Sequence, residues 1–152
     1  MKKKTMIYVL MIIGYLIISI TIFYPRDLVR IIGEGPNIGS SAHLTVIHRN
    51  SISEEGTIVE SYNKDHSKEI LEFLRMYKYR KTNISYQKLD NVEYYTIKIE
   101  NNGQQVFRAA VRGDRYLSVI DRNGNWSIFR VSGDKFDTKF LEDLYKNLSK
   151  ID

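Results

Sequence analysis

The sequence predicts an α+β domain that follows an N-terminal transmembrane helix. Three observations predict this fold class: an uncharged apolar run near the N-terminus, two segments whose apolar residues recur at helical spacing, and several short runs in which apolar and polar residues alternate. The expected order after the first helix is β-β-α-β-β-β-β-α. Short loops make the last four strands antiparallel neighbours in a β-meander, and the two amphipathic helices are expected to cover one face of that sheet.

The chain divides into three parts. Its 152 residues have room for one ordinary domain and one short special segment. We expect residues 1–24 to form a cytoplasmic basic tip and a transmembrane signal anchor, residues 25–41 a linker, and residues 42–152 an extracytoplasmic α+β domain. The linker assignment depends on turn formers such as Gly33-Glu-Gly-Pro-Asn37 and on the lack of a periodic apolar face there.

The apolar run is TMIYVLMIIGYLIISITIFY, residues 5–24, and it contains no charged residue. As a helix, twenty residues span about 30 Å, the thickness of the hydrocarbon core of a bilayer. Lys2, Lys3 and Lys4 precede the run, so the positive-inside tendency places the N-terminus in the cytoplasm and the rest of the chain outside. The predicted location is the cell membrane, crossed once.

A cleaved signal peptide is the alternative for this segment. Its apolar region would be about 7–15 residues long and would precede a small-x-small cleavage site. Here the apolar run is longer, and the best candidate site, Ser19-Ile20-Thr21, lies inside it. The sequence therefore favours an uncleaved anchor.

The first part of the domain has two strands and a helix. Residues 43–49 and 57–62 have the composition of strands, with a turn-like segment between them. Asp65 is the expected N-cap of a helix that runs to about Tyr77. Its apolar stripe predicts that one side packs on the sheet.

The second part has four strands and a helix. The predicted strands cover residues 95–100, 107–112, 115–120 and 126–131. Asp137 is the expected N-cap of the last helix, whose apolar stripe consists of Phe140, Leu141, Leu144, Tyr145 and Leu148.

Residues 121–126, DRNGNW, resemble part of a calcium loop because oxygen-bearing side chains alternate and a glycine is present. The glycine is at the wrong position, however, and the twelfth position, which requires a bidentate glutamate, is Ser132. Asn123-Gly124 indicates instead a two-residue hairpin turn, which would set Val119 opposite Ile128. We therefore expect no metal and no cofactor.

The sequence contains no recognisable catalytic constellation. It has no cysteine and no Gly-x-Ser-x-Gly elbow, and its turn aspartates are explained by local hydrogen bonding. His43 and His48 lie five residues apart on one predicted strand, so they should point to opposite faces and cannot share a metal. We expect no catalytic residue and no enzyme activity.

One basic and aromatic segment is a candidate contact with an anionic surface, either lipid headgroups or an envelope polymer. Its residues are Arg75, Tyr77, Lys78, Tyr79, Arg80 and Lys81. The alternative is that these cations only complement the negative end of the preceding helix dipole.

The net charge of +5 does not predict nucleic-acid binding. Without Lys2, Lys3 and Lys4 the chain has 20 basic and 18 acidic residues, and no concentrated basic face is evident. We expect a membrane partner and no nucleic acid, and the sequence leaves the oligomeric state open.

Three segments, KEILEFLRMYKYRKT, EYYTIKIEN and DRYLSVIDRNGNWSIFRV, make residues 57–131 resemble uncharacterised membrane-anchored extracytoplasmic domains of low-GC Gram-positive bacteria. In these domains a signal anchor or lipoprotein signal precedes a helix and a meander of short strands. The resemblance carries over no catalytic residue and no ligand. With the architecture, it favours a binding or accessory module at the cell envelope, whose partner is an envelope protein or an anionic polymer. The alternatives are a membrane-tethered envelope hydrolase and an inhibitor or immunity-type protein.

Overall fold

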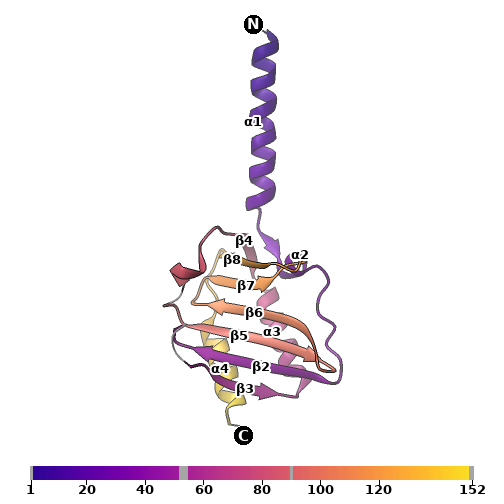
Figure 1. The fold of residues 1–152 in the computed structure, drawn as a ribbon, viewed down its shortest axis with the longest axis vertical. Helices are drawn as coiled ribbons and strands as arrows, with labels where there is room; N and C mark the ends of the chain where they lie inside the picture. The colour runs from indigo at the N-terminus through magenta and orange to yellow at the C-terminus, as the bar shows by residue number, and fades with distance from the viewer. Residues whose placement is uncertain (1, 52–54, 90, 151–152) are drawn as a thin grey trace.

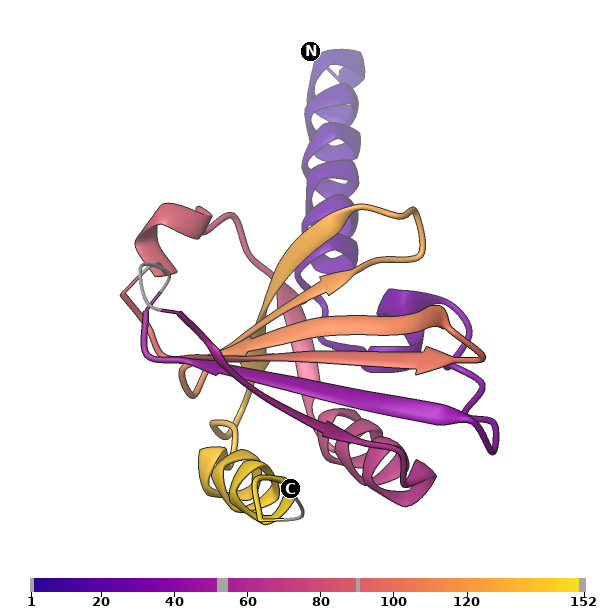
Figure 2. The ribbon, with the colours of Figure 1, turned by 60° about the horizontal axis from the view of Figure 1, so that its bottom comes forward.

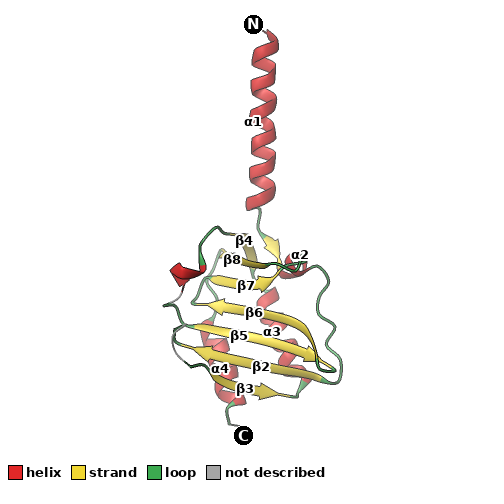
Figure 3. Cartoon of the chain, viewed as in Figure 1, coloured by secondary structure: helices red, strands yellow, loops and turns green. Residues whose placement is uncertain are grey.

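The computed structural model describes residues 2–51, 55–89 and 91–150 (Figure 1). Figure 3 shows which of its segments are helices and which are strands. In chain order the elements are α1 (Lys2–Phe23), β1 (Arg26–Asp27), α2 (Leu28–Ile32), β2 (Ala42–Arg49), β3 (Thr57–Ser61), α3 (Lys64–Arg75), β4 (Lys78–Lys81), the 3₁₀ helix η1 (Tyr86–Leu89), β5 (Tyr94–Asn101), β6 (Gln104–Arg112), β7 (Tyr116–Ile120), β8 (Trp126–Ser132) and α4 (Thr138–Leu148).

All eight described strands form one antiparallel sheet in the order β1-β4-β8-β7-β6-β5-β2-β3. The consecutive neighbours β5 to β8 are the predicted meander, which is confirmed together with the α+β class. Helices α3 and α4 lie on the same face of the sheet (Figure 2). Among the described residues, no helix therefore covers the opposite face over the middle strands.

The core lies between the sheet and the two helices. On β5 the alternation of side chains sends Ile97 and Ile99 to this face, and both are fully buried. Ile70 and Leu74 of α3 and Leu141 of α4 meet the sheet from the helical side. Burying such a side chain contributes about 1.5–3 kcal/mol, so these apolar stripes hold the layers together.

The predicted linker is partly a component of the domain, which corrects the boundary at residue 42. Residues 26 and 27 form the edge strand β1, which pairs with β4 in the register Arg26↔Tyr79. The five-residue helix α2 places Leu28 and Ile31 in the core, where they are 0% and 4% exposed. Ile32 and Ile38 are partly buried and also pack against the core. These four apolar residues stand among several turn formers, so they form no periodic pattern in the sequence.

Helix α3 begins and ends differently from the prediction. Its N-cap is Asn63, whose side chain accepts a hydrogen bond from the backbone N–H of Asp65 at 3.0 Å. The helix ends at Arg75, and the chain continues almost at once into β4. The helical pattern predicted through Tyr77 was therefore wrong at its end, because pairing of β4 with β8 takes up the following residues.

Helix α1 projects away from the domain (Figure 1). All of its large apolar side chains between Met6 and Ile20 are exposed. No helix among the described residues has both the length and the apolar character needed to span a membrane. The transmembrane assignment of residues 5–24 stays a prediction.

The β7–β8 hairpin forms at the predicted place but in a different register. Ser118, not Val119, lies opposite Ile128, and Asp121 and Asn125 close the loop through a 2.9 Å backbone hydrogen bond. Gly124 has a positive φ of 78°, whereas the φ of Asn123 is not positive. The loop is therefore a three-residue turn with a glycine at its last position, a form in which only one residue needs positive φ.

The Asp121 carboxylate organises this loop. Its Oδ1 accepts hydrogen bonds from the backbone N–H groups of Asn123 and Asn125 at 2.9 and 3.1 Å, and its Oδ2 accepts one from Ser127 Oγ at 3.0 Å. Desolvation opposes ionisation of this carboxyl, but the hydrogen bonds outweigh it and lower the pKa of Asp121. The side chain that suggested a calcium ligand is thus engaged within its own hairpin.

Replacing Asp121 by alanine is expected to lower the free energy of unfolding by about 1 kcal/mol at pH 7, because the loop N–H groups lose their acceptor. The folded-state pKa is below the unfolded value of about 3.9, so this contribution is present above about pH 4 and is lost as the pH falls through the folded pKa. Urea unfolding at neutral and acidic pH measures it. Exposed Asp134 in the next turn is the control position, and an equal loss in Asp134→Ala would contradict the assignment.

Candidate anion-binding site

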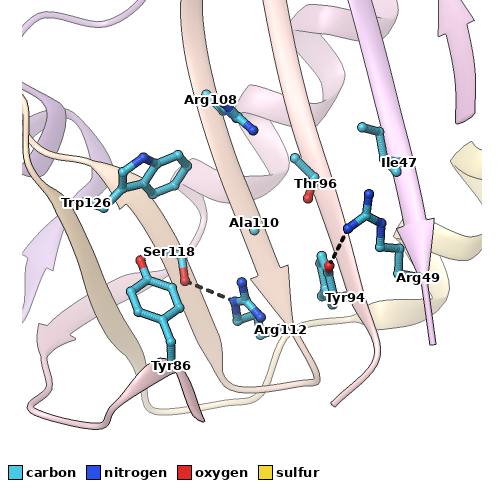
Figure 4. Close-up of a pocket in the computed structure, with 10 residues that line it drawn as sticks. All are labelled: Ile47, Arg49, Tyr86, Tyr94, Thr96, Arg108, Ala110, Arg112, Ser118 and Trp126. Carbon is cyan, nitrogen blue, oxygen red and sulfur yellow. Dashed lines mark hydrogen bonds between the residues drawn. The ribbon is translucent and has the colours of Figure 1, made fainter. Parts of the chain in front are cut away.

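The uncovered face of the sheet contains a hollow of about 400 Å³ (Figure 4). Its walls and floor come from four strands of the meander, from β2 and from η1. The lining residues are Ile47, Arg49, Tyr86, Tyr94, Thr96, Arg108, Ala110, Arg112, Ser118 and Trp126. This volume falls within the range of small-molecule sites, about 300–1,000 Å³.

The hollow exists because one row of side chains across the sheet is small. Thr96, Ala110 and Ser118 are direct cross-strand neighbours on β5, β6 and β7, and they form its floor. Along β6 the same face carries Arg108 on one side of Ala110 and Arg112 on the other (Figure 4). Long side chains therefore surround a short row, and space remains above it.

Arg112 is the most unusual residue of the hollow. It is only 8% exposed, and its guanidinium lies 4.6 Å from the ring centre of Tyr94 and 5.3 Å from that of Tyr86. Its Nε donates a hydrogen bond to Ser118 Oγ at 3.3 Å, whereas Nη1 is buried without a partner among the described residues. A buried guanidinium normally has an acidic partner, and in the described part of the chain Arg112 has no ion pair.

Two more arginines complete the positive lining. Arg49 donates from Nη1 to the Tyr94 hydroxyl at 3.1 Å, and its Nε is buried without a partner among the described residues. At the other end, the Arg108 guanidinium lies 5.6 Å from the ring centre of Trp126. The ten described lining residues thus include three arginines and no Asp, Glu or His. Such a surface attracts an anion and offers aromatic rings for a flat or apolar part of it.

Comparison of the chain with protein-family models, curated proteins and solved structures finds no match.

The basic segment predicted from the sequence does not line this hollow. Its two tyrosines face inward: Tyr79 is fully buried and donates a hydrogen bond to the Leu74 carbonyl at 2.5 Å, and Tyr77 packs on Phe136. Desolvation by burial raises the pKa of Tyr79 above its usual range.

The four cations of that segment are exposed. Arg75 ends α3, and its guanidinium lies against Gly35. Lys78 forms an ion pair with Asp27. Arg80 lies opposite Arg130 in the backbone register of β4 and β8, and Lys81 is the last residue of β4. The predicted anionic-surface contact stays a prediction, restricted to these four side chains.

The histidines lie outside the hollow. His43 and His48 point to opposite faces of β2, as predicted, since Leu44 and Val46 share the buried face with His48. His43 lies 3.5 Å from Glu60 and 3.6 Å from Glu100, and His48 Nε2 lies 2.7 Å from Glu93. In the part of the chain that the structure describes, no three metal-ligating side chains gather.

The hollow was missed from the sequence, although one signal for it was present. The β6 stretch from Arg108 to Arg112 alternates Arg, Ala and Arg on one face, which places a small residue between two cations. Arg49 and Trp126 are distant in sequence from this stretch, and only the strand register brings them to it. The signal therefore indicated a basic strand face but not a site.

Proposed function

We propose that this protein is a membrane-anchored, extracytoplasmic binding module whose open sheet face binds an anionic ligand at the cell envelope. The observation that carries the binding half is Arg112, a buried guanidinium without an acidic partner among the described residues. Burying a charge without a counter-charge costs several kcal/mol. A ligand anion in the hollow would offset that cost, which is the physical reason to assign a binding role to this face.

The composition of the hollow supports binding over hydrolysis. Hydrolysis of an envelope polymer would need a general acid or base, most often a carboxylate or a histidine, near the substrate. The ten described lining residues contain neither type. In the described part of the chain Ser61 Oγ lies 2.8 Å from His66 Nδ1, a hydroxyl–imidazole pair, and neither residue lines the hollow.

The anchor half is supported by the sequence and by the position of α1. Residues 5–24 contain no charge and follow three lysines. In the structure the apolar side chains from Met6 to Ile20 are exposed, and the helix stands clear of the domain (Figure 1). An exposed apolar surface of this kind favours a partner, and lipid would suit the uncharged run of residues 5–24.

Trp126 provides a direct test of ligand binding. It is the only tryptophan in the chain and it lines the hollow, so its fluorescence reports on that site. We expect polygalacturonate, an acidic polysaccharide, to change the fluorescence of the full-length chain in detergent in a saturable way. We expect added salt to weaken the effect, because screening reduces attraction between charges. Uncharged dextran is the control, and an equal response to dextran would contradict an anion site.

A further inference from the structure

We infer that the chain has a second binding site, for the phosphate of an anionic phospholipid headgroup, at the junction of α1 and the domain. A separate hollow of about 400 Å³ lies there, lined by Ile20, Tyr24, Arg26, Arg30 and Arg122. These five described residues include three arginines and no acid. The inference rests on the anchor half of the proposed function, because that half places the hollow beside a bilayer.

The domain itself fixes two of the three arginines. Arg30 is exposed on α2, which the buried side chains of Leu28 and Ile31 attach to the core. Arg122 lies in the β7–β8 loop, and its backbone N–H donates to the Ile31 carbonyl at 2.9 Å. The loop and α2 therefore hold their guanidinium groups near each other.

Gly33 permits this close approach. It has a φ of 89°, and a Cβ added there would lie 3.3 Å from the Cβ of Arg122. A side chain at residue 33 would therefore be strained and would press on the loop. The DRNGNW hairpin thus presents Arg122 beside α2.

The position of the hollow along the axis of α1 matches the headgroup layer of a bilayer. If residues 5–24 occupy the hydrocarbon core, Arg26 lies two residues beyond its edge, within the roughly 5–8 Å of polar headgroups on each side. Tyr24 and Val29, which are 61% and 42% exposed, supply the aromatic and apolar contacts typical of this interface.

The local charge favours an anion. None of the five described lining residues is acidic, and Asp27, the residue after Arg26, forms an ion pair with Lys78. A guanidinium group binds phosphate through two parallel hydrogen bonds, which makes arginine suited to headgroup phosphates.

The test is a lipid titration of the full-length chain in detergent micelles, with bound lipid counted by native mass spectrometry. We expect phosphatidylglycerol to bind more tightly than zwitterionic phosphatidylcholine. In the double variant Arg30→Gln/Arg122→Gln we expect phosphatidylglycerol affinity to fall roughly tenfold or more, because each juxtamembrane cation contributes separately. The matched control is Lys139→Gln/Lys146→Gln, which removes the same charge from two exposed residues of α4, at the end of the domain opposite α1 (Figure 1), and should retain the affinity.

Three results would overturn the inference. The first is equal affinity for phosphatidylglycerol and phosphatidylcholine, and the second is an equal loss of phosphatidylglycerol affinity in both double variants. The third is displacement of phosphatidylglycerol by inorganic phosphate at similar concentration, which would indicate a free-phosphate site. Single Arg30→Gln keeps the test valid if the double variant misfolds, because Arg30 is exposed and outside the core. Sodium carbonate extraction from vesicles tests the anchor separately. Release of the chain there would contradict the proposed anchor, whereas loss of headgroup selectivity alone would contradict only this site.

Discussion

Replacing Arg112 by methionine is expected to weaken binding of polygalacturonate by a factor of about 10–100. Hydrogen bonds to charged groups contribute about 1.5–3 kcal/mol, which corresponds to this range in the dissociation constant. Arg112 has the least exposed guanidinium of the hollow, so water screens its attraction to a ligand least. The loss is measured by titration of Trp126 fluorescence in the wild-type chain and in the variant.

The same substitution should leave the stability of the unliganded chain unchanged or increased. Most substitutions of a buried residue destabilise, but here methionine removes a charge without a described acidic partner and fills similar space with an apolar side chain. Urea unfolding without ligand measures this. A variant that binds weakly and is at least as stable would show that Arg112 is retained for binding.

Arg130→Met is the matched control for this prediction. Arg130 is an exposed arginine on β8 and does not line the hollow, so its replacement removes the same charge from the domain. We expect its affinity for polygalacturonate to stay close to that of the wild-type chain. If both variants lose affinity equally, the overall charge of the domain binds the polymer and the hollow does not.

The parts of the fold that the sequence predicted are those with local, periodic patterns. Strands β5 to β8 alternate apolar and polar residues and are joined by short turns, so both their existence and their order follow from neighbouring residues. Helices α3 and α4 carry apolar stripes long enough to recognise. Strands β1 and β4 are two and four residues long and exist because they pair with each other and with β8, information that no local window contains.

The hairpin register and the candidate site could not be predicted from the sequence for a related reason. Asn123-Gly124 permits either a two-residue or a three-residue turn, and the choice depends on how the Asp121 side chain bonds the loop. A shift of one residue moves a side chain to the other face of the sheet. The hollow depends on such registers between several strands, so the residues that line it could be recognised only after the sheet was known.

Replacing Phe73 by alanine is expected to cost the domain about 3–5 kcal/mol, the range found for truncation of a buried phenylalanine. Phe73 is 2% exposed on α3, and its ring stacks on that of Phe140 in α4 with centres 4.4 Å apart. It also contacts the rings of Tyr77 and Phe136 at 5.4 and 6.0 Å. Truncation of Phe73 therefore removes a ring of α3 that contacts α4 and belongs to the core beneath the sheet.

This loss is a large part of the 5–15 kcal/mol that usually stabilises a domain, so the variant should unfold at much lower urea concentration when followed by circular dichroism. Met76→Ala is the control because Met76 caps the same helix but is 70% exposed, and its replacement should change stability by no more than about 0.5 kcal/mol. If Phe73→Ala were as mild as Met76→Ala, the helices would be held to the sheet independently of each other. A large loss in Phe73→Ala with a small one in Met76→Ala would mean that α3, α4 and the sheet share one core.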